Sequence, residues 1–249
     1  MKYWTKSWNT MYGCTKTRAG CENCWALVMA RRMSANSKFR DKNKHDIDIV
    51  NSKGDWTGDI VYRYDRVNTP YHWRKPQIVA VNWMGDMFHY NVAPGLWYRL
   101  YEVMSATPQH VYLILTKRYG TLTMKDCLKP VNNVYIGVTI SNQRDAETAL
   151  PCLLWIHNLG WKTWVSYEPA LETVDWRPFG FIDGLVCGGE SGSKAREMSL
   201  VCPANAFIFC RDNGIPFTFK QWGSNTNDKV TNISYAWINK YEFPKERTL

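Results

Sequence analysis

The sequence predicts an α/β protein, a partial or complete β/α (TIM-like) barrel of parallel strands. Its length of 249 residues is ordinary for one barrel of this kind. Hydrophobic residues make up 45% of the chain, enough for a large core. Short apolar runs alternate with longer amphipathic stretches, which is the pattern of repeated β–α units. A doubly wound open sheet is the alternative arrangement of the same elements.

Seven short runs are predicted to be the strands. Several of them are continuously apolar, as expected for parallel strands that are buried on both faces. They span residues 2–8, 77–83, 110–115, 133–139, 162–166, 184–187 and 216–219.

Helices are predicted between these runs, at residues 24–34, 95–105, 143–159 and 203–213. Pro151 would kink or split the third helix, and Gly214 would end the fourth. The polar stretch 40–75 interrupts the rhythm and is expected to be an inserted loop or hairpin. We expect residues 1–249 to form a single domain.

Charge and hydropathy limit the functional classes. A formal net charge of +9 favours nucleic acids, nucleotides or phosphate esters as partners, although a solvated basic surface explains it equally well. The sequence has no apolar run of the roughly 18 residues that a membrane helix needs, and its first six residues lack the apolar core of a signal peptide. We therefore expect a cytoplasmic protein without a membrane partner, in which cysteines are thiols or metal ligands.

The segment "GCTKTRAGCENCWA", residues 13–26, is the most informative stretch of the chain. It places Cys14, Cys21 and Cys24 at C-x6-C-x2-C spacing directly after the first predicted strand. Three thiolates on a short loop suit a soft metal or an iron–sulfur cluster. Buried structural cysteines and a zinc site are the alternatives, but the chain completes no familiar zinc spacing. A cluster held by three cysteines would leave one iron open to a further ligand.

This loop and the helix after it resemble those of radical S-adenosylmethionine (SAM) enzymes. Along nearly its whole length the chain also resembles a phage and bacterial family with a three-cysteine motif. The matching segments are "SWNTMYGCTKTRAGCENCWA", "VNWMGDMFH", "LILTKR", "VYIGVTISNQ", "VSYEPALE", "LVCGGESG" and "PFTFKQWG". The usual radical-SAM spacing is C-x3-C-x2-C, often with an aromatic residue where Asn23 stands here.

The resemblance implies a [4Fe–4S] cluster on the three cysteines, with SAM as the second cofactor. It implies an enzyme that generates a 5′-deoxyadenosyl radical and abstracts hydrogen from its substrate, using an external electron donor. A nucleic-acid base or nucleotide is the expected substrate. The phage-type match implies that the substrate is a modified nucleobase in phage DNA. The reaction would be thymine hypermodification or an isomerase-type rearrangement of an attached amino acid, and it would take place in the host cytoplasm. A zinc-stabilised nucleic-acid-binding protein without catalysis is the alternative, and a cluster that serves as a sensor or repair centre is a third reading.

Further candidate residues follow the predicted strands, where ligands bind in such sheets. By the resemblance, Gly85 would allow close backbone approach and Asp86 would accept hydrogen bonds from the methionine ammonium. A plain turn is the structural alternative. The other residues expected to contact SAM are Lys117, Thr139, Asn142, Glu168 and Glu190, and those expected to contact substrate are Arg118, Lys220, Gln221 and Trp222.

Overall fold

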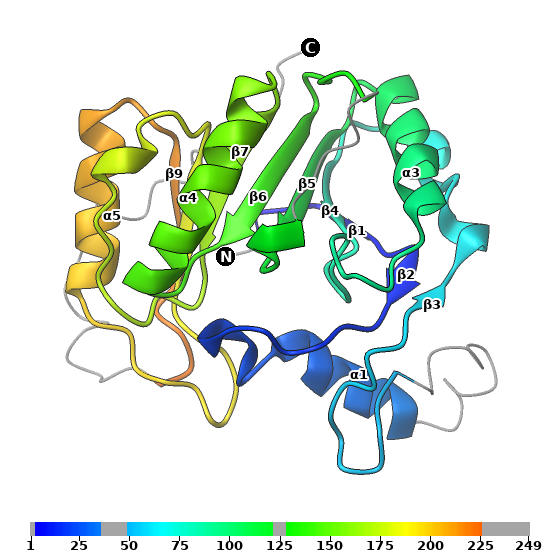
Figure 1. Ribbon diagram of the computed structural model, residues 1–249, viewed down its shortest axis with the longest axis horizontal. Helices are drawn as coiled ribbons and strands as arrows, with labels where there is room; N and C mark the ends of the chain where they lie inside the picture. Colours follow the sequence, from blue (N-terminus) through cyan, green and yellow to red (C-terminus); the bar gives the residue numbers. More distant parts are fainter. Residues whose placement is uncertain (1–2, 36–48, 122–127, 226–249) are drawn as a thin grey trace.

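The computed structural model describes residues 3–35, 49–121 and 128–225. Its centre is a curled sheet of seven parallel strands that forms a half-barrel (Figure 1), so the predicted fold class is confirmed. The strands are β1 Lys6–Trp8, β4 Ile78–Val81, β5 Val111–Thr116, β6 Val134–Thr139, β7 Lys162–Tyr167, β8 Leu185–Gly188 and β9 Phe217–Gln221. They lie side by side in chain order, without the reversal of order that defines a doubly wound sheet.

The seven predicted strands are all present, but some of their ends differ. β4 stops at Val81 because Asn82 adopts a positive φ of 55°, which asparagine tolerates better than most residues. The Asn82 side chain accepts hydrogen bonds from the backbone nitrogens of Thr10 and Met11. β9 continues to Gln221, which pairs with Gly188 across a register shift. Lys220 and Gln221 therefore lie within the strand rather than after it.

The four predicted helices are confirmed as α1 Trp25–Ala35, α3 Pro94–Ala106, α4 Gln143–Asn158 and α5 Val201–Asp212. Pro151 does not split α4, which continues through it. Asn142 caps the start of this helix, because its side chain accepts a hydrogen bond from the backbone nitrogen of Asp145.

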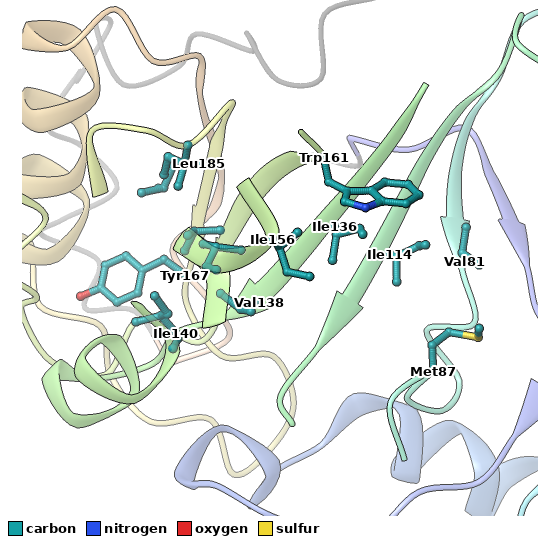
Figure 2. Packing of buried hydrophobic residues seen from close by; sticks show 14 of the residues in the cluster. Val81, Met87, Ile114, Ile136, Val138, Ile140, Ile156, Trp161, Tyr167 and Leu185 are labelled. Atoms are coloured by element: carbon teal, nitrogen blue, oxygen red, sulfur yellow. The ribbon is translucent and has the colours of Figure 1, made fainter. Parts of the chain in front are cut away.

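Helices α3, α4 and α5 pack against one face of the sheet and form the main core. Figure 2 shows Ile114, Ile136 and Val138 of adjacent strands in this core, with Ile156 of α4. A second cluster lies on the opposite, concave face. It contains Tyr3, Ile78, Val111, Leu113, Trp164 and Val186, with Trp4 and Trp83 packed against it. Burial on both faces explains why the strand sequences are continuously apolar.

Close packing on the concave face depends on a glycine. The Trp164 ring lies over Gly137 of the neighbouring strand, where an added Cβ would be only 2.3 Å from the indole nitrogen. That nitrogen donates a hydrogen bond of 3.1 Å to the carbonyl of Ile114. Gly137 therefore allows a fully buried indole to lie flat across three strands.

The predicted insertion is seen only in part, because residues 40–48 lie outside the described ranges. In the described part, β3 Val61–Tyr62 pairs antiparallel with β2 Met11–Tyr12, a strand that the sequence did not predict. Val50 forms an isolated antiparallel bridge with Trp56. The insertion is thus joined to the segment that leads into the cysteines. Within the described ranges, no helix is long and apolar enough to cross a membrane.

Candidate functional site

A cavity of about 250 Å³ lies at the carboxyl ends of the strands, between the sheet and the cysteine loop. Figure 1 shows α1 and the loop before it lying across this end of the sheet. The cavity is where ligands are expected in parallel β/α folds. Its lining includes the predicted residues Cys14, Cys21, Cys24, Gly85, Asp86, Lys117, Thr139, Glu168, Glu190, Lys220 and Gln221.

The cysteine loop is held over the sheet by Arg18. Its Nε donates to the backbone carbonyl of Lys117 at 2.9 Å, and its guanidinium lies 3.8 Å from the centre of the Tyr119 ring. It also forms an ion pair of 3.3 Å with Asp145. Gly20 completes the contact, since a Cβ there would be 2.6 Å from Ser141 Oγ. The loop therefore packs directly on the ends of β5 and β6.

Arg118 fixes the loop at its first cysteine. Its Nη2 donates to the Thr15 carbonyl at 3.0 Å and also contacts the Thr15 hydroxyl. His89 Nε2 lies 3.2 Å from the same hydroxyl, while His89 Nδ1 accepts a hydrogen bond from a backbone N–H. Burial, and to a lesser extent Asp86, raise the pKa of the Cys14 thiol to about 12 against the opposing effect of Arg118. Arg118 is absent from the cavity lining and instead positions the loop.

The three cysteines share the cavity wall, with Cys21 buried and Cys14 and Cys24 half-buried. Among the described residues, no three His, Cys, Asp or Glu side chains are grouped as ligands of one metal ion. A tetrahedral ion with thiolate ligands at about 2.3 Å would hold its sulfurs about 3.8 Å apart. A cluster of several irons is a larger body and needs its thiolates further apart. The three thiols that line one cavity are a donor set that such a cluster could use, and the cluster itself stays a prediction.

Asp86 lines the cavity, but its carboxylate already has protein partners. Oδ1 accepts from the Phe88 nitrogen at 2.9 Å and Oδ2 from the Lys117 nitrogen at 3.1 Å. The Thr116 hydroxyl lies within 2.9 Å of both oxygens. Asp86 therefore joins the end of β4 to the end of β5. Its expected bond to a cofactor ammonium stays a prediction.

Glu168 and Lys220 form an ion pair in the wall of the cavity. Lys220 Nζ lies 2.6 Å from Glu168 Oε1, although the two are not aligned as a hydrogen bond. The other oxygen, Oε2, accepts from the Tyr3 hydroxyl at 2.9 Å and from Ser166 at 3.2 Å. Sequence reasoning missed Tyr3, because nothing in the chain indicates that a residue before β1 reaches the end of β7.

Glu190 is likewise engaged by protein groups. Arg196 donates to both of its oxygens, and Asn23 donates to Oε2 at 2.9 Å. Burial raises the pKa of Glu190, but the hydrogen bonds from Arg196 and Asn23 outweigh it and lower that pKa overall. Glu190 is therefore a carboxylate that contacts the cysteine loop.

Three predicted residues do not line the cavity. Asn142 caps α4, and Arg118 holds Thr15. The Trp222 ring packs edge-on against Phe219 at 4.8 Å between centres. Their expected contacts with cofactor or substrate stay predictions.

Other lining residues come from positions that the sequence did not single out. They include Tyr3, Trp4, Thr15, Lys16, Thr17, Trp25, Trp56, Trp83, Leu115, Ser166 and Ser191. Aromatic rings thus contribute much of the wall on both sides of the cavity.

A family model described as "Protein of unknown function (DUF5131)" matches residues 1–241. The chain belongs to this family. No curated protein and no solved structure matches the chain. The family covers both the cysteine loop and every strand of the half-barrel, so the site belongs to the shared part of the chain.

Proposed function

We propose that this DUF5131 protein is a radical SAM enzyme that holds a [4Fe–4S] cluster on Cys14, Cys21 and Cys24. The observation that carries the proposal is the position of these thiols. All three line one cavity at the carboxyl ends of a parallel half-barrel. The resemblance of the cysteine loop to radical SAM enzymes supplies the identity of the cofactors.

When bound, the cluster and SAM would supply a 5′-deoxyadenosyl radical for hydrogen abstraction. The chain's own residues bind, orient and enclose the reactants. Lys117 presents an ammonium group for a carboxylate or phosphate, and Lys220 would do so on leaving its ion pair with Glu168. Trp25, Trp56 and Trp83 offer flat apolar surfaces against which a ring could pack.

A nucleic-acid base or nucleotide is the substrate class that we propose. The net charge of +9 and the aromatic lining support it. A modified nucleobase in phage DNA is the finer proposal, with thymine hypermodification or rearrangement of an attached amino acid as the reaction. A base in duplex DNA would have to leave the stack to enter this cavity. An external electron donor completes the scheme.

Anaerobic purification, iron and sulfide analysis and a 5′-deoxyadenosine assay test the proposal. We expect about four irons and four sulfides per chain, and release of 5′-deoxyadenosine after reduction. Cys21→Ala should lose both signals. Cys152→Ala is the matched control, because Cys152 is a half-buried thiol on α4 that does not line the cavity.

The other outcomes identify the alternatives. A colourless protein with stoichiometric zinc would indicate the zinc-stabilised nucleic-acid-binding protein. A cluster without SAM cleavage would indicate a sensor or repair centre. Full iron content in Cys21→Ala would contradict the ligand assignment itself.

A further inference from the structure

We propose that Arg196 is a positioning residue for the turn from Cys21 to Cys24, called the cysteine turn below. It fixes the residues between Cys21 and Cys24 to the segment that follows β8, so that both thiols are in place before a cofactor binds. The inference rests on the proposed function for the role of the thiols. The contacts that support it involve protein atoms alone.

The first support is the position of the Arg196 guanidinium between two segments. On one side, Nε and Nη2 donate to the two carboxylate oxygens of Glu190 at 3.0 and 2.6 Å. On the other side, Nη2 donates to the Ala19 carbonyl and Nη1 to the Glu22 carboxylate, both at 3.0 Å. Charge-assisted, two-pronged contacts of this kind are among the stronger hydrogen bonds in proteins.

Asn23 makes a second connection between the same segments. Its Nδ2 donates to Glu190 Oε2 and to the Lys194 carbonyl, each at 2.9 Å. Glu22 and Asn23 are the two residues that separate Cys21 from Cys24. Each of them contacts the 190–196 segment directly, so the position of both thiols depends on that segment.

These contacts give Glu190 a role other than the contact with SAM that the resemblance implies. Its side chain is only 5% exposed, and its oxygens accept from four protein donors: the backbone nitrogen, Nε and Nη2 of Arg196, and the amide of Asn23. Glu190 thus acts on the cysteines through Arg196 and Asn23. A lysine at 196 could pair with the carboxylate but could not reach the turn at the same time, because it lacks the planar fork.

Thiol labelling of the metal-free protein tests the inference. Cys21 is 8% exposed, so N-ethylmaleimide should reach it only when the turn opens. We expect Arg196→Met to raise the labelling rate of Cys21 by about tenfold or more, because several charge-assisted hydrogen bonds are lost. Arg196→Lys should restore part of the protection. The rates are read from peptide mass spectra after timed quenching.

Two references separate opening of the turn from general unfolding. Cys187 in β8 is fully buried and should stay unlabelled in Arg196→Met. Arg177→Met is the matched control. It removes an exposed two-pronged pair with Asp175, made outside the cysteine loop, and should leave the rate of Cys21 unchanged.

Unchanged labelling of Cys21 in Arg196→Met would overturn the inference. Equal increases at Cys21 and Cys187 would also overturn it, since Arg196 would then support the whole fold. If Arg196→Met does not fold, Asn23→Ala removes the second connection and should give the same selective labelling. The assay uses no cofactor, so a wild-type protein without a cluster would refute the proposed function and leave this result intact.

Discussion

Gly137→Ala is expected to destabilise the fold through the ring of Trp164. The new Cβ would lie 2.3, 2.4 and 2.6 Å from three atoms of the indole ring. All three distances are far below van der Waals contact, and the ring is rigid and fully buried. Trp164 must therefore move, which costs about 1–3 kcal/mol for overpacking. Loss of its hydrogen bond to Ile114 adds about 0.5–1.5 kcal/mol. The expected loss of unfolding free energy is thus about 1.5–4.5 kcal/mol.

Urea unfolding followed by far-UV circular dichroism measures this loss. A chain of this length is expected to have a slope near 3 kcal/mol per molar urea, so the midpoint should fall by about 1 M. Gly95→Ala is the matched control, because nothing lies within 4 Å of a Cβ at that position. The ring of Trp164 stacks at 6.2 Å on Trp83, which lines the cavity, so ligand binding should weaken as well. Equal midpoints for Gly137→Ala and the wild type would refute this account of the concave face.

Two further predictions concern buried polar groups near the cavity. Asp86→Asn should lower the unfolding free energy of the cofactor-free protein by about 2 kcal/mol, because each carboxylate oxygen accepts a backbone N–H and either amide orientation would oppose one of them. Asp59→Asn, at an exposed position, is the control. If Asp86→Asn and the wild type were equally stable in urea, the carboxylate at position 86 would not be needed for stability, and cofactor binding would remain as its role. Burial and, second to it, the positive charge of Arg118 lower the pKa of His89 to about 4. The unfolded state therefore binds more protons than the folded state between pH 6.5 and 4. The unfolding free energy should therefore fall by about 1–2 kcal/mol as the pH drops through that window, after a discount for solvent screening. In His89→Gln the urea midpoint should depend less on pH than in the wild type, whereas the exposed control His72→Gln should keep the wild-type dependence.

Much of the fold could be predicted because its signals are local. Continuous apolar runs such as 110–115 identify strands buried on both faces, and the helices between them carry apolar residues at helical spacing. The predicted positions of the strand ends were less accurate than the predicted strands themselves. The turn at Asn82 and the register shift beside Gly188 depend on hydrogen bonds to distant strands, and these leave little trace in the local sequence.

The candidate site was predicted in location but not in its internal contacts. Because parallel strands end at the same edge of a sheet, residues after different strands could be placed together from the sequence. The hydrogen-bond partners of each carboxylate could not be predicted from the sequence. Asp86 is engaged by the neighbouring strand, and Glu190 by an arginine six residues later in the chain.

By itself, the sequence determined the chain's parallel β/α architecture, the edge at which a site would form and the three thiols that face it. Those properties follow from residue spacing along short stretches. Only the tertiary structure decided which polar groups face the cavity and which form hydrogen bonds that hold the cysteine loop above it. That division depends on contacts such as Tyr3 with Glu168 and Asn23 with Glu190, more than 160 residues apart in the chain. Hydrogen-bond partners at such separations are chosen by the folded geometry, not by local pattern.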